Sequence, residues 1–321
     1  MKKKSFRYAL IISLAILLVS TAFLLLEMWE KRQGEFSAAG FLDTTMEYKG
    51  QEYVLKDNVE TFLVLGLDKF EGVLTNDSYN NDQQADFLLL LVFDNEKKQC
   101  EAIQINRDTM ANMSVLGVAG QKIDTVNKQI ALAHTYGNGK EVSCRNTADA
   151  VSELLLGVNI DHYISLTMDA VPVLNDLVGG VEVTLLEDFT DVDAAMVKGK
   201  TVTLKGEQAL HYVRTRYGLE DSSNSARMER QKQYIQALYE QSMQRVSQDE
   251  EFLVEATVKL ADHMVSDRSV NRLQELAEKF AAYEFKGVNS IEGELVLGEE
   301  FMEFYPNEDA IKETVVNLFY E

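Results

Sequence analysis

Two uninterrupted apolar runs stand at residues 61–67 (TFLVLGL) and 87–93 (FLLLLVF) of this chain. Each has the length of a strand but not the alternation of a strand with one face in water, so both are expected to be buried on both faces. A third strand is predicted at 100–105, and the short polar link 94–99 favours an antiparallel hairpin between the second and third strands. The chain is therefore expected to form a sheet covered by helices.

The rest of the sequence fits that architecture. Apolar spacing and turn residues predict further helices and strands along the chain. The predicted helices are 127–136, 146–156, 168–178, 226–245, 252–264, 270–283 and 308–320, and the predicted strands are 162–166, 181–185 and 292–297. The expected fold class is α/β, with a mixed central β-sheet flanked by helices.

The N-terminus carries a membrane signal. Residues 8–26 are uncharged and mostly apolar, and they follow four cations, Lys2, Lys3, Lys4 and Arg7. This length suits a transmembrane helix, and the cations predict a cytoplasmic N-terminus with the remainder outside the cell membrane. A cleaved signal peptide is the alternative, but its apolar region should be only about 7 to 15 residues long and end at small residues. The predicted organisation is a cytoplasmic stub (1–7), a single transmembrane helix (8–26), a membrane-proximal segment (27–58), a main domain (59–245) and an extension packed on that domain (246–321).

The chain is strongly acidic, with a formal net charge of −21. We do not expect general nucleic-acid binding, because neutralising the phosphates requires a broad excess of Lys and Arg. Any anionic ligand must then be met by a local group of cations. The two cysteines, Cys100 and Cys144, allow one disulfide outside the cytoplasm, and two unpaired buried thiols remain the alternative.

Four polar residues are expected at one edge of the sheet. Asp68 follows the first strand, Asp86 opens the second, and Arg107 and Asp108 follow the third. If the first two strands are also antiparallel, all four meet. The two carboxylates Asp68 and Asp86 suit Mg²⁺ or Mn²⁺, which bind substrate phosphates in their remaining positions. Capping of turns and strand ends is the ordinary alternative for both aspartates.

A sharper signal is the clustering of arginines in HYVRTRYGLEDSSNSARMERQKQ. Arg214, Arg216, Arg227 and Arg230 lie close in sequence, and the last two share one helical face. Guanidinium groups bind phosphate in a bidentate manner and keep their charge, so such a group suits a pyrophosphate. Surface ion pairs with neighbouring acidic residues are the alternative, although they do not explain why the cations gather here. No Walker loop, GxSxG, HExxH or zinc-type cysteine spacing occurs, and the four histidines are scattered.

The order and spacing of several motifs resemble the LytR-CpsA-Psr family of cell-wall glycopolymer ligases. The motifs span roughly residues 60–240 and are FLVLGLD (62–68), ADFLLLLVFD (85–94), QINRDTM (104–110), ALAHTYGNG (131–139), IDHYISL (160–166), LVGGVEV (177–183), GEQALHYVRTR (206–216) and ARMERQ (226–231). The resemblance implies that residues 59–245 form a catalytic domain. It implies a divalent-metal-dependent transfer of a glycopolymer from an undecaprenyl-pyrophosphate carrier to a sugar hydroxyl of peptidoglycan, with release of undecaprenyl phosphate. A non-catalytic extracytoplasmic protein that binds or senses such precursors is the alternative.

The resemblance also implies roles for individual residues. Asp68 and Asp86 match the family's metal-associated aspartates, and Asp108 matches the acidic partner of the motif arginine, able to orient Arg107 or deprotonate the acceptor. The matches to the pyrophosphate-binding set are Arg107, Arg214, Arg216, Arg227, Arg230 and Gln231, with Lys122 as a further basic position. The lipid carrier implies an apolar tunnel between the sheet and its helices. Gln84, Ala85 and Phe87 depart from the family pattern, which has an arginine, a small hydroxyl residue and a threonine at these three positions.

Overall fold

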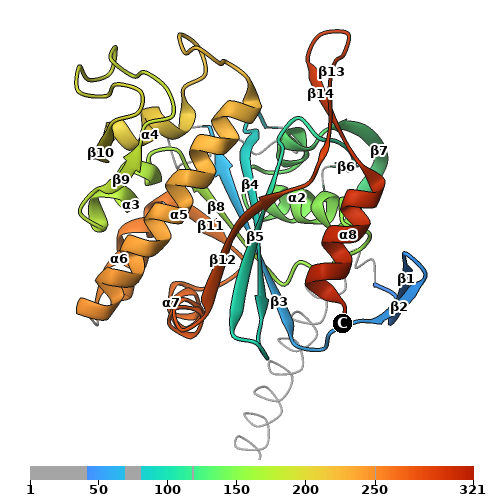
Figure 1. The fold of residues 1–321 in the computed structure, drawn as a ribbon. Helices are drawn as coiled ribbons and strands as arrows, with labels where there is room; N and C mark the ends of the chain where they lie inside the picture. The colour runs from blue at the N-terminus through green and yellow to red at the C-terminus, as the bar shows by residue number, and fades with distance from the viewer. Residues whose placement is uncertain (1–41, 69–80, 118, 250) are drawn as a thin grey trace, which may run out of the picture. The chain divides into compact units, whose positions relative to one another are not determined.

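The structure, a computed structural model, describes residues 42–68, 81–117, 119–249 and 251–321, and its centre is a six-stranded mixed sheet (Figure 1). In spatial order the strands are β11 (Met264–Ser266), β8 (His162–Thr167), β3 (Val59–Leu67), β4 (Ala85–Asp94), β5 (Gln99–Ile105) and β12 (Glu284–Ser290). The predicted α/β class with a mixed central sheet is confirmed. Residues 264–290 supply both edge strands.

The pairing of the three central strands is the predicted one. β4 runs antiparallel to both β3 and β5, with Leu90 opposite Leu63 on one side and Ile103 on the other. The end of β3, the start of β4 and the end of β5 therefore lie at one edge of the sheet. β8 runs parallel to β3, and β12 runs parallel to β5.

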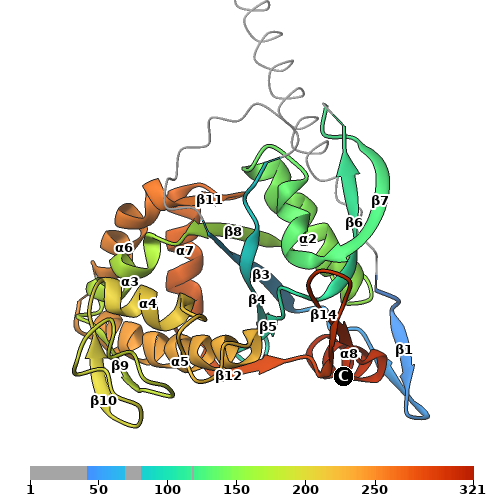
Figure 2. The same cartoon turned by 90° about the horizontal axis from the view of Figure 1, so that it is seen from above.

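Helices cover both faces of the sheet (Figure 2). On one side lie α2 (Glu141–Leu154) and the 3₁₀ helix η1 (Ile130–Thr135), and on the other lie α3 (Ala170–Leu177), α5 (Asn224–Gln248), α6 (Phe252–Leu260) and α7 (Val270–Phe280). Leu63, Leu65, Leu88 and Leu90 are fully buried in the core that contains α2, whereas Phe62 and Phe93 are buried on the other face, against Leu276 and Tyr283. This two-sided burial explains why β3 and β4 read as continuous apolar runs.

Smaller elements surround the sheet. They are β1 (Thr45–Tyr48), β2 (Gln51–Val54), β6 (Met110–Leu116), β7 (Lys122–Gln129), β9 (Val181–Thr184), β10 (Thr201–Leu204), α4 (Glu207–Arg214), η2 (Ala261–His263), β13 (Gly293–Leu297), β14 (Met302–Pro306) and α8 (Glu308–Phe319). The hairpins β1–β2, β6–β7, β9–β10 and β13–β14 are each two-stranded sheets of their own.

Two helix predictions are wrong in part. Residues 122–129 form β7, which pairs with β6, and only 130–135 are helical, as a 3₁₀ helix. The helix predicted at 252–264 ends at Leu260, and Met264 enters β11 against β8. In both cases strand pairing, which is non-local, overrides a local apolar spacing that suits a helix.

Cys100 and Cys144 are both free and buried. Cys100 packs with Phe62, Leu276 and Tyr283, whereas Cys144 belongs to the core formed around α2. Because the two thiols pack in different hydrophobic clusters, they do not form the disulfide that the sequence left open.

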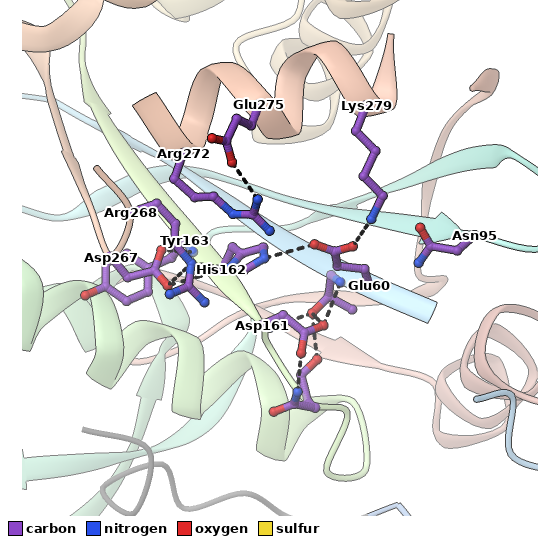
Figure 3. Close-up of polar contacts among 12 residues, drawn as sticks. Glu60, Asn95, Asp161, His162, Tyr163, Asp267, Arg268, Arg272, Glu275 and Lys279 are labelled. Atoms are coloured by element: carbon purple, nitrogen blue, oxygen red, sulfur yellow. Dashed lines mark hydrogen bonds and ion pairs between the residues drawn. The ribbon is translucent and has the colours of Figure 1, made fainter. Parts of the chain in front are cut away.

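The starts of β3 and β8 carry a set of paired charges, here called the basal network: Glu60, His162, Asp267, Arg268 and Lys279 (Figure 3). Glu60 accepts hydrogen bonds from Lys279 Nζ at 2.5 Å and from His162 Nε2 at 3.0 Å. Arg268 Nε donates to His162 Nδ1 at 2.9 Å and lies 3.4 Å from Asp267. The network joins α7 and the residues after β11 to the starts of β3 and β8, at the end of β3 remote from Asp68.

In the part of the chain that the structure describes, no helix combines the length and apolar character of a membrane span. The span predicted at 8–26 lies outside the described residues.

Candidate active site

Arg107 is held at the sheet edge by two residues that the strand order brings to it, Asp86 and Gln84, and by its neighbour Asp108. Its guanidinium donates hydrogen bonds to Asp86 and, at 2.9 Å, to Gln84 Oε1. Its Nε lies 3.4 Å from Asp108 Oδ1. Asp86 lies at the start of β4, Gln84 directly precedes that strand, and Arg107 follows β5, so the antiparallel β4–β5 pair creates these contacts.

Asp108 is a buried carboxylate in the same loop. Its Oδ1 accepts a hydrogen bond from Gln129 Nε2 at 3.1 Å. Burial raises the pKa of Asp108, and the opposing charges of Arg107, Arg227 and Arg216 reduce that shift without cancelling it. A carboxylate whose pKa is raised is a better proton acceptor than an ordinary aspartate.

Arg227 approaches from the first turns of α5 and is almost fully buried. Its guanidinium donates to Asn224 Oδ1, and Asn224 Nδ2 donates to Asn106 Oδ1 at 2.7 Å. Burial, together with the positive charges of Arg216 and Arg107, lowers the pKa of Arg227 to about 9. No ion pair to a carboxylate is found for Arg227 within the described residues, so its charge is incompletely balanced.

The residues Arg107, Asp108, Arg216 and Arg227 act on one another's charge and are here called the site cluster. It contains three guanidinium groups and one carboxylate, and Asp86 and Asp68 offset part of the charge at Arg107. Burying like charges together is costly unless an anion joins them. The cluster is therefore suited to bind a compact, multiply charged anion.

Arg230 lies close by but is engaged with the protein. Its side chain is fully buried, with Nε donating to Tyr212 O at 3.0 Å and the terminal nitrogens donating to Glu187 and to Thr215 O. The ion pair fastens α5 to the segment that follows β9, and the two hydrogen bonds to backbone carbonyls fasten it to α4 and to the residue after that helix. The structure thus gives Arg230 a positioning role, with its charge still acting on Arg227.

The other residues that were predicted to bind the pyrophosphate lie in two different places. Arg214, at the end of α4, lines an apolar cavity together with Gln231 and Arg227. Lys122 is exposed at the far end of β7, seven residues from Gln129, which contacts Asp108. That separation is roughly 20 Å along an extended strand. The structure therefore does not bring Lys122 to the site cluster.

Asp68 and Asp86 lie where a metal ion was predicted. Asp68 Oδ1 is buried and has no hydrogen-bond partner among the described residues, and the charge of Asp68 acts on Arg107. No group of three or more His, Cys, Asp or Glu able to hold a metal is present in those residues. Two carboxylates with one free buried oxygen fit Mg²⁺ or Mn²⁺, which complete their coordination with water and phosphate oxygens.

The apolar cavity has a volume of about 240 Å³ and lies between the sheet and the helices α3 and α5. Most of its wall is aliphatic or aromatic, including Leu65, Phe87, Leu89, Leu174 and Tyr234. Its charged wall residues are Asp86, Arg214 and Arg227. An apolar cavity with charge gathered in part of its wall suits an amphiphile whose headgroup is anionic.

Comparison with known proteins identifies the family. The model of the LytR_cpsA_psr family matches residues 33–314. The chain belongs to this family.

Members of the LytR_cpsA_psr family are similar to the chain in sequence and in fold. One, from Enterococcus faecalis, is the polyisoprenyl-teichoic acid–peptidoglycan teichoic acid transferase TagU, 29% identical over 73% of this chain and 70% of its own length. Another, the cell wall biosynthesis protein LcpA of Corynebacterium glutamicum, is 29% identical over 50% of this chain but only 33% of its own length. A crystal structure of B. subtilis TagV matches with a TM-score of 0.60 and 21% identity, covering 82% of this chain and 97% of TagV.

Five residues of the protein described here contribute to the site although the sequence did not predict them. They are Gln84, Asn106, Gln129, Glu187 and Asn224. Asn106 stands inside the motif QINRDTM and Asn224 at the start of α5, so each had a weak signal in its position. Gln129 and Glu187 had none, because their contacts with Asp108 and Arg230 depend on non-local packing. Gln84, which replaces the arginine of the common family pattern, orients Arg107 by a hydrogen bond.

Proposed function

We propose that this protein transfers a glycopolymer from a polyprenyl-pyrophosphate carrier to a sugar hydroxyl of peptidoglycan. The observation that carries the proposal is the site cluster beside an apolar cavity, with Arg227 in both. The family membership and the transferase name of the E. faecalis relative support it. The substrate is then an amphiphile whose lipid occupies the cavity and whose diphosphate meets the arginines.

The transfer exchanges one phosphorus–oxygen bond for another. The acceptor hydroxyl oxygen bonds to the phosphorus that carries the glycan, and the bond from that phosphorus to the bridging oxygen breaks. Undecaprenyl phosphate leaves with the electron pair, and the hydroxyl proton passes to the carboxylate of Asp108. The glycan ends in a phosphodiester linkage to peptidoglycan.

The side chains of the protein have separate tasks in this reaction. Arg107, Arg216 and Arg227 stabilise the negative charge that develops on the bridging and terminal oxygens. Asp86 and Gln84 fix the plane of the Arg107 guanidinium. Asp68 and Asp86 would hold Mg²⁺ or Mn²⁺, which supplies further neutralisation of phosphate charge.

We place the reaction outside the cell membrane. The apolar run 8–26, preceded by cations, would anchor the chain with its N-terminus in the cytoplasm. That arrangement brings the site to the side of the membrane where peptidoglycan lies. Nucleic acid is no substrate in this proposal.

A turnover assay distinguishes the transferase from a protein that only binds precursors. Full-length protein in detergent is mixed with Mg²⁺, a short-chain prenyl-pyrophosphate-linked disaccharide and soluble uncrosslinked glycan strands, and the released prenyl phosphate is measured. Arg107→Ala is expected to reduce turnover by roughly 100-fold or more, as for loss of one preorganised charge donor. Arg272→Ala is the matched control, because Arg272 is exposed and pairs with the equally exposed Glu275, at 2.7 Å. Wild-type protein that binds the donor yet never cleaves it would overturn the proposal.

A further inference from the structure

A second cavity, also of about 240 Å³, reaches the loop that carries Arg107 and Asp108. It is here called the polar cavity. Asn106 and Thr109 of that loop line it, together with the ends of β5, β12 and β14 and the first turns of α5. Unlike the apolar cavity, about half of the residues in its wall are polar or charged.

A hydrogen-bonded pair of glutamines separates the two cavities. Gln104 lines the polar cavity and Gln231 lines the apolar one. Gln104 Nε2 donates to Gln231 Oε1 at 2.7 Å, and Gln231 Nε2 donates to Val213 O at 3.0 Å. The carbonyl of Val213 thus fixes the orientation of both amides.

This fixed orientation leaves an unpaired acceptor. Gln104 is 2% exposed, and its Oε1 has no hydrogen-bond partner among the described residues. The Oγ atom of Ser290 is also buried and has no hydrogen-bond partner among the described residues. Ser290 lines the polar cavity and is the register partner of Gln104 across the β5–β12 pair. Buried polar groups are almost always paired with protein, water or a ligand, so two orphans beside one cavity mark a polar part of its wall that a bound molecule could satisfy.

The charges of the polar cavity favour a neutral ligand. Its ionic residues are Glu229, Glu292 and Lys232, and Lys232 Nζ is paired with Glu229 at 2.9 Å. One carboxylate is therefore unbalanced in a very acidic chain, which repels polyanions. Phe304 and Met228 add apolar faces to the wall. Apolar faces combined with hydrogen-bonding groups suit a sugar ring with hydroxyl and acetamido substituents.

We propose that the polar cavity binds a neutral N-acetylhexosamine residue of the acceptor glycan and presents its hydroxyl to the site cluster. This inference rests on the proposed function. The donor lipid and the acceptor sugar then approach from opposite sides of the Gln104–Gln231 pair.

The cavity wall and the proton acceptor are fixed to each other. Phe304 N donates to Asp108 O at 2.8 Å, and Gln129 Nε2 contacts both Asp108 Oδ1 and, at 2.8 Å, Met302 O. The hairpin β13–β14 therefore positions the Asp108 carboxylate relative to the sugar. Because β14 contacts both the cavity wall and the loop of Asp108, it can keep an acceptor hydroxyl aligned with the Asp108 carboxylate.

Direct binding tests the inference without requiring turnover. The probe is a soluble oligomer of N-acetylglucosamine, which is neutral, titrated calorimetrically into full-length protein in detergent. Ser225→Trp places a large side chain at an exposed position of the cavity wall on α5 and is expected to weaken binding at least tenfold. Ser247→Trp is the matched control, because Ser247 is exposed in the last turn of the same helix and donates its hydrogen bond to the nearby Gln244 O. Its glycan affinity should equal that of wild type.

A second variant tests the orphan hydroxyl. Ser290→Ala removes a group that has no partner in the described protein, so its melting temperature should not fall. Its glycan affinity is expected to fall by roughly two- to tenfold, the value of one hydrogen bond.

The outcomes separate this inference from the proposed function. Glycan binding that depends on Ser225, in a wild-type protein that never cleaves the donor, supports the cavity assignment and refutes the transferase. Unchanged glycan affinity in Ser225→Trp, or no glycan binding by wild type at millimolar concentration, overturns the assignment. A Ser225→Trp protein that loses affinity for the prenyl-linked disaccharide but not for the N-acetylglucosamine oligomer also overturns it, because the cavity then holds the donor.

Discussion

The strand β3 begins beside one group of charges and ends beside another, and the two are built in opposite ways. In the basal network every charged group faces an opposite charge or a hydrogen-bond partner (Figure 3). In the site cluster three guanidinium groups share the carboxylate of Asp108, with Asp86 bonded to Arg107, and Arg227 Nε is buried without a hydrogen bond in the described residues.

The pKa shifts express the same contrast. Burial raises the pKa of Glu60, but the hydrogen bonds from Lys279 and His162 outweigh it and hold the pKa below its usual value. For Arg227 burial and neighbouring cations act in the same direction and destabilise the charge. Complete pairing indicates a structural role, whereas incomplete pairing indicates a place for a ligand.

The largest expected effect follows from removing the proton acceptor. Asp108→Asn should reduce turnover by about 10² to 10⁴-fold, the usual contribution of a general base. Asp108 must be ionised to act, and its pKa is raised by burial, so wild-type kcat/KM should rise with pH through a value above the ordinary range of aspartate. The variant should lack this limb of the pH profile. Asp124→Asn, at an exposed position of β7, is the control and should keep the wild-type profile.

A slightly smaller effect on turnover is expected at Arg227. Arg227→Met should lower donor turnover by about 10² to 10³-fold, because a preorganised cation is lost. Its free energy of unfolding should not decrease, since a poorly compensated buried charge is replaced by an apolar chain of similar length. Arg245→Met, on the same helix but 40% exposed, controls for the change of residue type. A variant that loses stability and activity together would show that Arg227 is a structural residue.

The basal network should give the reverse result. Glu60→Ala leaves Lys279 and His162 without their shared acceptor and should cost about 1–3 kcal/mol of unfolding free energy. Turnover of the folded protein should stay at the wild-type level, because Glu60 lies at the start of β3 and Asp68 just past its end. Urea denaturation and an activity assay at the same temperature measure both quantities. The control Glu275→Gln, in an exposed pair, should change stability by less than about 0.5 kcal/mol.

The sequence predicted the parts of the fold that depend on strong, short-range patterns. The apolar runs of β3 and β4, together with the hairpin to β5, were enough to place Asp68, Asp86, Arg107 and Asp108 at one edge of the sheet. The spacing of Arg227 and Arg230 on α5 likewise followed from helix geometry.

What the sequence did not predict depends on packing between distant segments. β7 has an exposed, charged composition and forms only because β6 pairs with it. Arg230 and Arg227 look alike in sequence, yet Glu187, over forty residues away, ties the first to the protein. The unequal charge balance of two neighbouring arginines is a tertiary property and has no local signature.

The smallest predicted effect tests whether any poorly compensated buried charge marks a site. Asp149, on α2, has its pKa raised to about 6 by burial, with Arg145 and Lys122 opposing the shift. Because the folded pKa lies above the unfolded one, the neutral form is favoured on folding, and stability is lost as pH rises from about 4 to 6. Asp149→Asn should therefore gain about 1–2 kcal/mol at pH 7 by urea denaturation, and this gain should shrink toward pH 4. Turnover should not change, and Glu153→Gln on the same helix should stay within about 0.5 kcal/mol of wild type. If Asp149→Asn instead loses turnover while folded, α2 carries a functional group, and incomplete pairing marks two sites in this molecule.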